Sequence, residues 1–144
     1  MVGVDGSEGA AAALEFAAGE AAFREARLRI VSVWEVPVAA YAGGFAPPPA
    51  PEIWEAFQTG AQQIADEALA SVKKLQPSLE AETIVVQGQP ANALLVQAAD
   101  AALIVVGRRG LGGFRSLLLG SVSQQVVQHA SCPVVIVNQP ATVS

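Results

Sequence analysis

The chain has 144 residues, of which 52% are hydrophobic, with a net charge of −5 and one cysteine. This length suits a single domain over residues 1–144 that can bury a core, and no apolar run approaches the roughly 18–20 residues that cross a bilayer. An acidic chain argues against a general nucleic-acid coat, and a lone cysteine cannot form an internal disulfide. No basic residues precede an apolar segment at the start, so we expect a cytoplasmic protein with no signal peptide and no membrane segment.

The N-terminal part predicts a strand, a helix and a second strand. Val2–Val4 is a short apolar run, and Ser7 can cap a helix that runs to about Ala26. Leu28–Trp34 has the almost continuous apolar pattern of a strand that is buried on both faces.

The middle of the chain predicts a loop and then a long helix. Residues 38–51 are rich in Ala and Gly and hold four prolines, which exclude a regular helix or a central strand, so we expect a flexible loop. Pro51 can open a helix in which apolar residues recur at helical spacing, and Pro77 stops it.

The second half continues the alternation of strands and helices. Three further strands are expected at Thr83–Val86, Leu103–Val106 and Val134–Val137, with one helix from the turn at Pro90 through Asp100 and another from near Ser121. Right-handed crossovers then predict a doubly wound α/β fold, with helices on both faces of one five-stranded parallel sheet, and we expect the strand order 3-2-1-4-5. Ligands of such sheets bind beyond the carboxyl ends of the strands where the order reverses, here between the first and fourth strands.

Residues 107–121 stand out in charge and in glycine content. Residues 1–100 carry all 13 acidic side chains, whereas residues 101–144 carry three arginines and no acid, so an anion could lie there without repulsion. Glycines allow successive amides to point into one concavity, and the helix that begins near Ser121 adds unpaired amides. Two interpretations stay open: a phosphate cradle, or a Gly-rich turn in which Ser121 is an ordinary N-cap.

Two common phosphate-binding motifs do not fit this segment. A Walker loop needs a lysine directly after its last glycine, and no lysine follows a glycine here. A dinucleotide fingerprint needs GxGxxG, but counting from Gly110 the sixth position is Arg115.

The spacing of this segment resembles a known family motif. Gly107-x-x-Gly110, nine residues and Gly120-Ser121 are similar to the G-2x-G-9x-G-[S/T] motif of ATP-binding universal stress proteins. The strings VGVDGS at 2–7, GQPA at 88–91, ALIVVG at 102–107 and CPVVIV at 132–137 resemble the same family in order and spacing. The resemblance spans essentially the whole chain and implies the fold predicted above.

The resemblance also implies a nucleotide site. Asp5 resembles the acid that contacts the adenosine end, although it could also be a turn residue before Gly6. Arg108 and Arg109 could pair with phosphates or could only solvate the loop. The expected nucleotide contacts are Gly3, Asp5, Val33 (through its main chain), Val106, Gly107, Arg109, Gly110, Gly120, Ser121 and Val122.

Groups for fast chemistry are not evident in the sequence. His129 and Cys132 have no neighbouring partner, so a surface histidine and a buried, inert thiol are expected, with no catalytic residue and no metal site in the protein. Residues 101–144 contain no carboxylate to hold a metal near a γ-phosphate, so any Mg²⁺ would depend on the phosphates, Ser121 and Asp5.

We therefore expect a stress-response regulatory protein that binds ATP, with or without Mg²⁺, and turns it over slowly at most. The alternatives are a slow ATP hydrolase or self-phosphorylating protein, and a dimeric interaction module of the same family without nucleotide. An apolar edge strand at Val134–Val137, together with the family resemblance, predicts a homodimer through that strand. Nucleic-acid and membrane partners are not expected.

Overall fold

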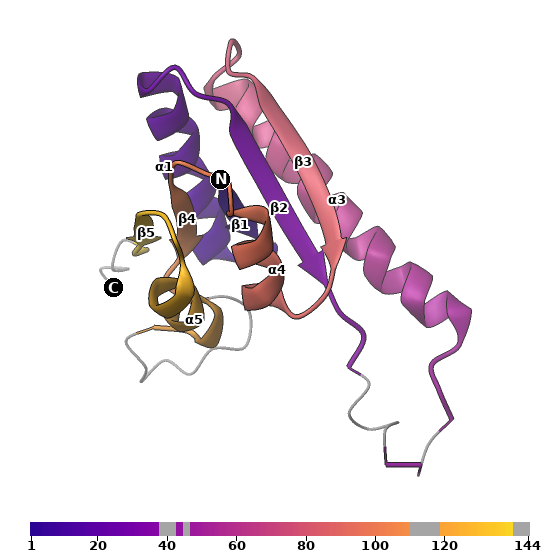
Figure 1. Cartoon of the computed structure of the whole chain (residues 1–144). Helices are drawn as coiled ribbons and strands as arrows, with labels where there is room; N and C mark the ends of the chain where they lie inside the picture. Colours follow the sequence, from indigo (N-terminus) through magenta and orange to yellow (C-terminus); the bar gives the residue numbers. More distant parts are fainter. Residues whose placement is uncertain (38–42, 45–46, 110–118, 140–144) are drawn as a thin grey trace, which may run out of the picture.

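A parallel sheet with helices on both faces makes up the part of the chain that the computed structural model describes, residues 1–37, 43–44, 47–109 and 119–139 (Figure 1). The strands are β1 (Val2–Val4), β2 (Leu28–Trp34), β3 (Ala81–Gln87), β4 (Ile104–Gly107) and β5 (Val134–Val137). The helices are α1 (Glu8–Phe23), α3 (Pro51–Leu75), α4 (Pro90–Gln97) and α5 (Ser121–His129). The strand order is β3-β2-β1-β4-β5, which confirms the predicted doubly wound fold.

Each face of the sheet has its own buried cluster. Neighbouring residues of a strand point to opposite faces, so Ile30 packs with Leu14 and other residues of α1 and α3, whereas Val31 packs with Leu94 of α4 and Val126 of α5. Both Ile30 and Val31 are completely buried. This burial on two sides explains the almost continuous apolar pattern of β2.

Two helices end earlier than their patterns predict. α1 was expected to run to Ala26 but ends at Phe23, because Glu25 adopts a positive φ of 54° that stops the helix. α4 was expected to run through Asp100 but ends at Gln97. The chain then forms a turn, and the Asp100 carboxylate in this turn pairs with Arg29. A local turn therefore ends α1, whereas the turn after α4 also makes a tertiary contact with β2.

The middle of the chain follows the prediction where it is described. α3 begins at Pro51, as predicted, and ends at Leu75 with Gln76 as its C-cap. β3 is longer than the predicted Thr83–Val86, because all seven residues of β2 pair with it. Of the predicted flexible loop, residues 38–42 and 45–46 lie outside the described residues, and 43–44 and 47–50 form neither helix nor strand.

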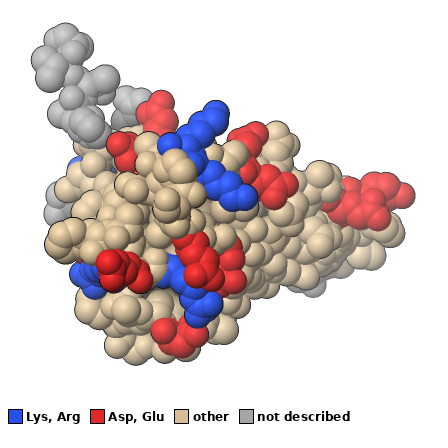
Figure 2. Space-filling view, turned by 90° about the horizontal axis from the view of Figure 1, so that it is seen from above, with Lys and Arg blue, Asp and Glu red and all other residues tan. Residues whose placement is uncertain are grey.

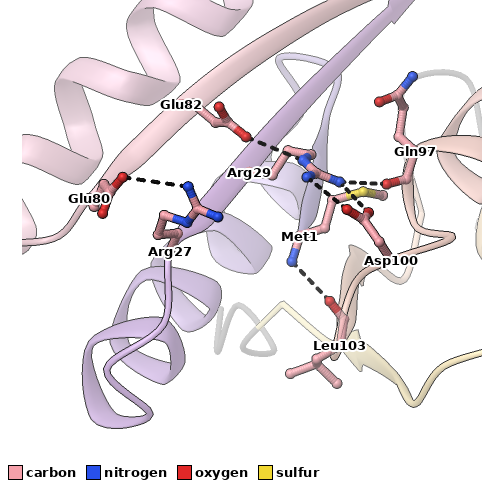
Figure 3. A network of polar contacts seen from close by, with 8 residues as sticks. All are labelled: Met1, Arg27, Arg29, Glu80, Glu82, Gln97, Asp100 and Leu103. Atoms are coloured by element: carbon pink, nitrogen blue, oxygen red, sulfur yellow. Dashed lines mark hydrogen bonds and ion pairs between the residues drawn. The ribbon is translucent and has the colours of Figure 1, made fainter.

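The edge at which the strands begin carries charges of both signs. Figure 2 looks onto this edge and shows acidic and basic side chains lying next to one another. Arg29 of β2 donates to Asp100 Oδ1 at 2.8 Å and to the carbonyl of Gln97 at 2.8 Å, and it lies 3.4 Å from Glu82 of β3 (Figure 3). The hydrogen bond from Arg29 holds the pKa of Asp100 below its ordinary value. This network ties β2, β3 and the end of α4 together.

Candidate functional site

A cavity of about 280 Å³ lies at the opposite edge, beyond the carboxyl ends of three strands. β1 contributes Gly3 and the residue after its end, Asp5, to the lining, β2 contributes Val33, and β4 contributes Val106 and Gly107. β1 and β4 are the neighbours at which the strand order reverses, so the cavity lies at the switch point that the topology predicts for a ligand.

The first turns of three helices complete the walls. The lining includes Ser7 and Ala10 at the start of α1, Pro90 at the start of α4, and Ser121 at the start of α5. A helix start presents amides without acceptors in the helix and a partial positive charge. Ser7 and Gln89 cap the starts of α1 and α4, whereas the start of α5 has no side-chain cap and therefore favours a ligand that is negatively charged.

The predicted site residues come together here wherever they are described. Nine of them line the cavity: Gly3, Asp5, Val33, Val106, Gly107, Arg109, Gly120, Ser121 and Val122. Gly110 lies outside the described residues. Contact of any of these residues with a nucleotide stays a prediction.

Asp5 holds the turn that follows β1 and also borders the cavity. Its Oδ1 accepts a hydrogen bond from the Ser7 amide at 2.9 Å, and Gly6 between them has a φ of 84° that favours glycine. Ser7 in turn caps α1 by accepting from the Ala10 amide at 3.1 Å. The turn role that the sequence offered as the alternative for Asp5 is therefore present, together with a position in the lining.

The two ends of the Gly-rich segment meet at the main chain of Arg108. Its carbonyl accepts from the Gly120 amide at 2.8 Å, and its amide donates to the carbonyl of Val137 at 3.0 Å. The N-cap of α5 is Gly120, with no side-chain hydrogen bond at the cap, so the interpretation of Ser121 as the N-cap is wrong. Ser121 is instead the first residue of the helix and is exposed.

Gly107 has a packing role that the sequence analysis did not identify. A Cβ atom at this position would lie 2.7 Å from both the carbonyl carbon and the carbonyl oxygen of Gly9 in α1. A Cβ atom on Gly9 would in turn lie 2.6 Å from the carbonyl oxygen of Arg109, so the close approach of α1 to the end of β4 requires glycine at both positions. The glycine that was assigned to phosphate binding is thus also required by the contact between helix and strand.

Sequence reasoning missed several residues of the lining: Val4, Ser7, Ala10, Val31, Pro90, Leu94 and Ser123. Most of them lie in the first turns of helices or on the strand face that carries Val33. A usable signal existed, because each helix that follows a parallel strand begins at the edge where the strand ends. That rule points to helix starts but not to individual side chains.

The charge at the cavity is small and of both signs. Of the described lining residues, Asp5 and Arg109 are ionisable, and both are partly buried. His129 is exposed at the far end of α5, and Cys132 is partly buried rather than fully buried as expected. Within the described ranges, no three His, Cys, Asp or Glu side chains gather in a group that could hold a metal ion, and no helix has the length and apolarity to span a membrane.

Comparison with known proteins decides the family. The model of the universal stress protein family matches residues 1–138. The chain belongs to the universal stress protein family. This confirms the resemblance drawn from the Gly-rich motif and the strings around it.

Relatives within the family differ in length. The universal stress protein Rv2623 of Mycobacterium tuberculosis is 35% identical over 143 residues, which are 99% of this chain and 46% of that protein, so this chain spans about half the length of that relative. A universal stress protein of Thermus aquaticus is 38% identical, covering 95% of this chain and 96% of its own. A universal stress protein solved in complex with cAMP is 29% identical, with a TM-score of 0.67, covering 95% of this chain and 93% of the other.

Proposed function

We propose that this universal stress protein binds an adenine nucleotide, with ATP as the principal candidate, and acts as a regulatory protein of the stress response. The observation that carries the proposal is the cavity at the switch point, whose lining combines Arg109 and the start of α5 with apolar side chains. A related protein, 29% identical, has been solved in complex with cAMP, which is an adenine nucleotide. Both findings support the same class of ligand.

The chemistry of the lining fits the two ends of such a ligand. Val31, Val33 and Leu94 offer apolar surface of the kind that receives a base, and their side chains belong to one buried cluster. Arg109 and the first amides of α5 offer positive charge and hydrogen-bond donors of the kind that receives phosphates. We assign the base to the first region and the phosphates to the second.

Slow turnover at most is part of the proposal. Asp5 is the carboxylate among the described lining residues, and its Oδ1 already accepts the Ser7 amide. Rapid phosphoryl transfer needs a positioned metal and a group that orients water. Any Mg²⁺ would therefore reach this site on the phosphates of the nucleotide, with oxygen atoms of Asp5 and Ser121 as the available protein groups. Formation of ADP at several turnovers per minute would contradict this part.

Calorimetric titration with ATP tests the proposal. We expect the wild type to bind, and Arg109→Ala to weaken affinity about tenfold or more, because charge-assisted hydrogen bonds to phosphate are lost. Arg27→Ala is the matched control, since it removes the same charge from an exposed side chain at the opposite edge of the sheet. Absence of binding by the wild type, or equal affinities in the two variants, would overturn the proposed site.

A homodimer through β5 and a cytoplasmic location complete the proposal. β5 is an edge strand of the sheet, and each of its four apolar residues is partly exposed. Edge strands of this kind pair readily with a second strand. The dimer is tested separately from the nucleotide, so that either part can fail alone.

A further inference from the structure

The main chain of Arg108 and Arg109 lies between the first turns of two helices, α1 and α5. On the α5 side, the carbonyl of Arg108 accepts from the Gly120 amide and from the Ser123 hydroxyl, each at 2.8 Å. On the α1 side, the carbonyl of Arg109 lies 2.6 Å from the place that a Cβ atom on Gly9 would take. These two peptide units thus have hydrogen bonds on the α5 side and close packing on the α1 side.

The Ser123 hydroxyl is the side-chain group that contacts these peptide units. Ser123 is 3% exposed and lines the cavity. Its Oγ lies 2.8 Å from the Arg108 carbonyl and 3.1 Å from the Gly120 carbonyl, and because a hydroxyl has one proton, the shorter contact to Arg108 is the better hydrogen bond. The hydroxyl therefore links the exit of β4 to the first turn of α5.

Gly9 provides the matching contact from α1. It is buried, and a side chain there would push directly on the Arg109 carbonyl. Gly19 in the same helix has no atom within 4 Å of the corresponding Cβ position. The contrast between two glycines of one helix shows that the tight fit belongs to the place where α1 meets Arg109.

We propose that Gly9 and Ser123 are positioning residues that fix the Arg108–Arg109 main chain as a preformed rim on the phosphate side of the cavity. The inference rests on the proposed nucleotide site and adds residues that were not part of the predicted set. A rim that is rigid before the ligand arrives avoids the entropy cost of ordering it on binding. Arg109 and the start of α5 then face the phosphates in one fixed arrangement.

The test compares ATP with adenosine, because adenosine lacks the groups that the rim would receive. Calorimetric titration of Ser123→Ala should show affinity for ATP reduced about five- to tenfold, as expected for one lost buried hydrogen bond, with affinity for adenosine unchanged. Gly9→Ala should show the same selective loss. Ser123→Thr retains the hydroxyl and should recover most of the ATP affinity.

Two controls match these variants closely. Gly19→Ala makes the same change in α1 without a neighbour to displace, and Ser71→Ala removes a serine hydroxyl that donates to the carbonyl of Glu67 in α3. Both should bind ATP like the wild type. Far-ultraviolet circular dichroism of every variant verifies the fold, and if Gly9→Ala does not fold, the comparison of Ser123→Ala with Ser123→Thr decides.

The outcomes separate this inference from the proposed function. If the wild type binds no ATP, the proposed function fails and the inference fails with it. If the wild type binds and both variants match their controls, the inference alone is overturned. Equal losses for ATP and adenosine would also overturn it, since general damage to the cavity does not distinguish the two ligands.

Discussion

Glycines in this protein occupy three different physical environments, and the surrounding atoms distinguish them. Gly6 has a φ of 84° and permits the turn after β1. Gly107 lies against the carbonyl of Gly9, and Gly9 lies against the carbonyl of Arg109, so neither position has room for a methyl group. Gly60 of α3 has nothing within 4 Å of its Cβ position, so packing gives no reason for a glycine there. Substitution of alanine for glycine is therefore predicted to change the stability of the fold in opposite directions at different positions.

Gly107→Ala should destabilise the fold. Its Cβ would lie 2.7 Å from the carbonyl of Gly9, so α1 or β4 must shift, at a cost of about 1–3 kcal/mol for overpacking. Gly60→Ala should raise the free energy of unfolding by about 0.5–1 kcal/mol, because alanine is the better helix former in open space. Urea unfolding of both variants at one pH measures the difference. A Gly107→Ala protein as stable as the wild type would contradict the close contact.

At the scale of single elements, β5 is an edge strand that pairs with one neighbour, β4. The carbonyls of Pro133 and Val137 accept hydrogen bonds from the amides of Ile104 and Arg108, so these residues face β4. Peptide groups alternate in direction along a strand, and those of Val134 and Ile136 therefore point away from the sheet. The outward amides are the groups that a second copy of β5 would use.

Ile136→Pro should prevent the proposed dimer while leaving the sheet intact. Proline removes the outward amide of Ile136, and it is tolerated in edge strands when that side of the strand faces solvent. Ile136→Ala is the control, since it shortens the side chain but retains the amide. Sedimentation equilibrium should give twice the monomer mass of 14.7 kDa for the wild type and for the control, and the monomer mass for the proline variant. A wild type that sediments as a monomer at micromolar concentration would contradict the dimer.

At the scale of the whole molecule, the edge where the strands begin and the edge where they end differ in charge pairing and in the presence of the cavity. The edge where the strands begin carries paired charges, with Arg29 joined to Asp100 and Glu82 across three elements (Figure 3). The edge where they end has the cavity, with Asp5 and Arg109 as ionisable groups among its described lining. Charge pairs are satisfied by the protein at the first edge, whereas the start of α5 at the second edge has no side-chain cap and can receive a ligand.

Acid should weaken the fold through the Arg29–Asp100 pair. Because Arg29 lowers the pKa of Asp100 below 3.8, the pair contributes stability that is present above this value and is lost as the pH falls through the pKa in the folded state. Asp100→Asn should therefore lower the free energy of unfolding at about pH 7, and this cost should become smaller toward about pH 2, as the carboxylate takes up a proton.

Urea unfolding at the two pH values measures this effect. Asp66→Asn is the control, because Asp66 is exposed on α3 and its Oδ1 accepts from Gln62, which an asparagine oxygen can also do. We expect the control to show little change at either pH. A cost of Asp100→Asn that is the same at both pH values would show that the charge on Asp100 does not stabilise the fold.

The sequence by itself determined the family, the alternation of strands and helices, and the edge of the sheet at which the candidate site lies, because these follow from motifs and local patterns. Apolar runs separated by helical periodicity fix a parallel sheet, and parallel strands carry the residues after their ends to one edge. Asp5, Gly107 and Ser121 are therefore expected at one edge from the sequence alone, and the structure puts all three in the lining of one cavity.

Only the tertiary structure decided which atoms touch. The contact of Gly9 with Gly107, the grip of Ser123 on the Arg108 carbonyl, and the choice of Gly120 rather than Ser121 as the cap of α5 depend on distances between segments that are far apart in the chain. Periodicity reports which face of an element is apolar, but it has no information about how closely two elements approach. That separation is set by the packing of whole side chains in the core.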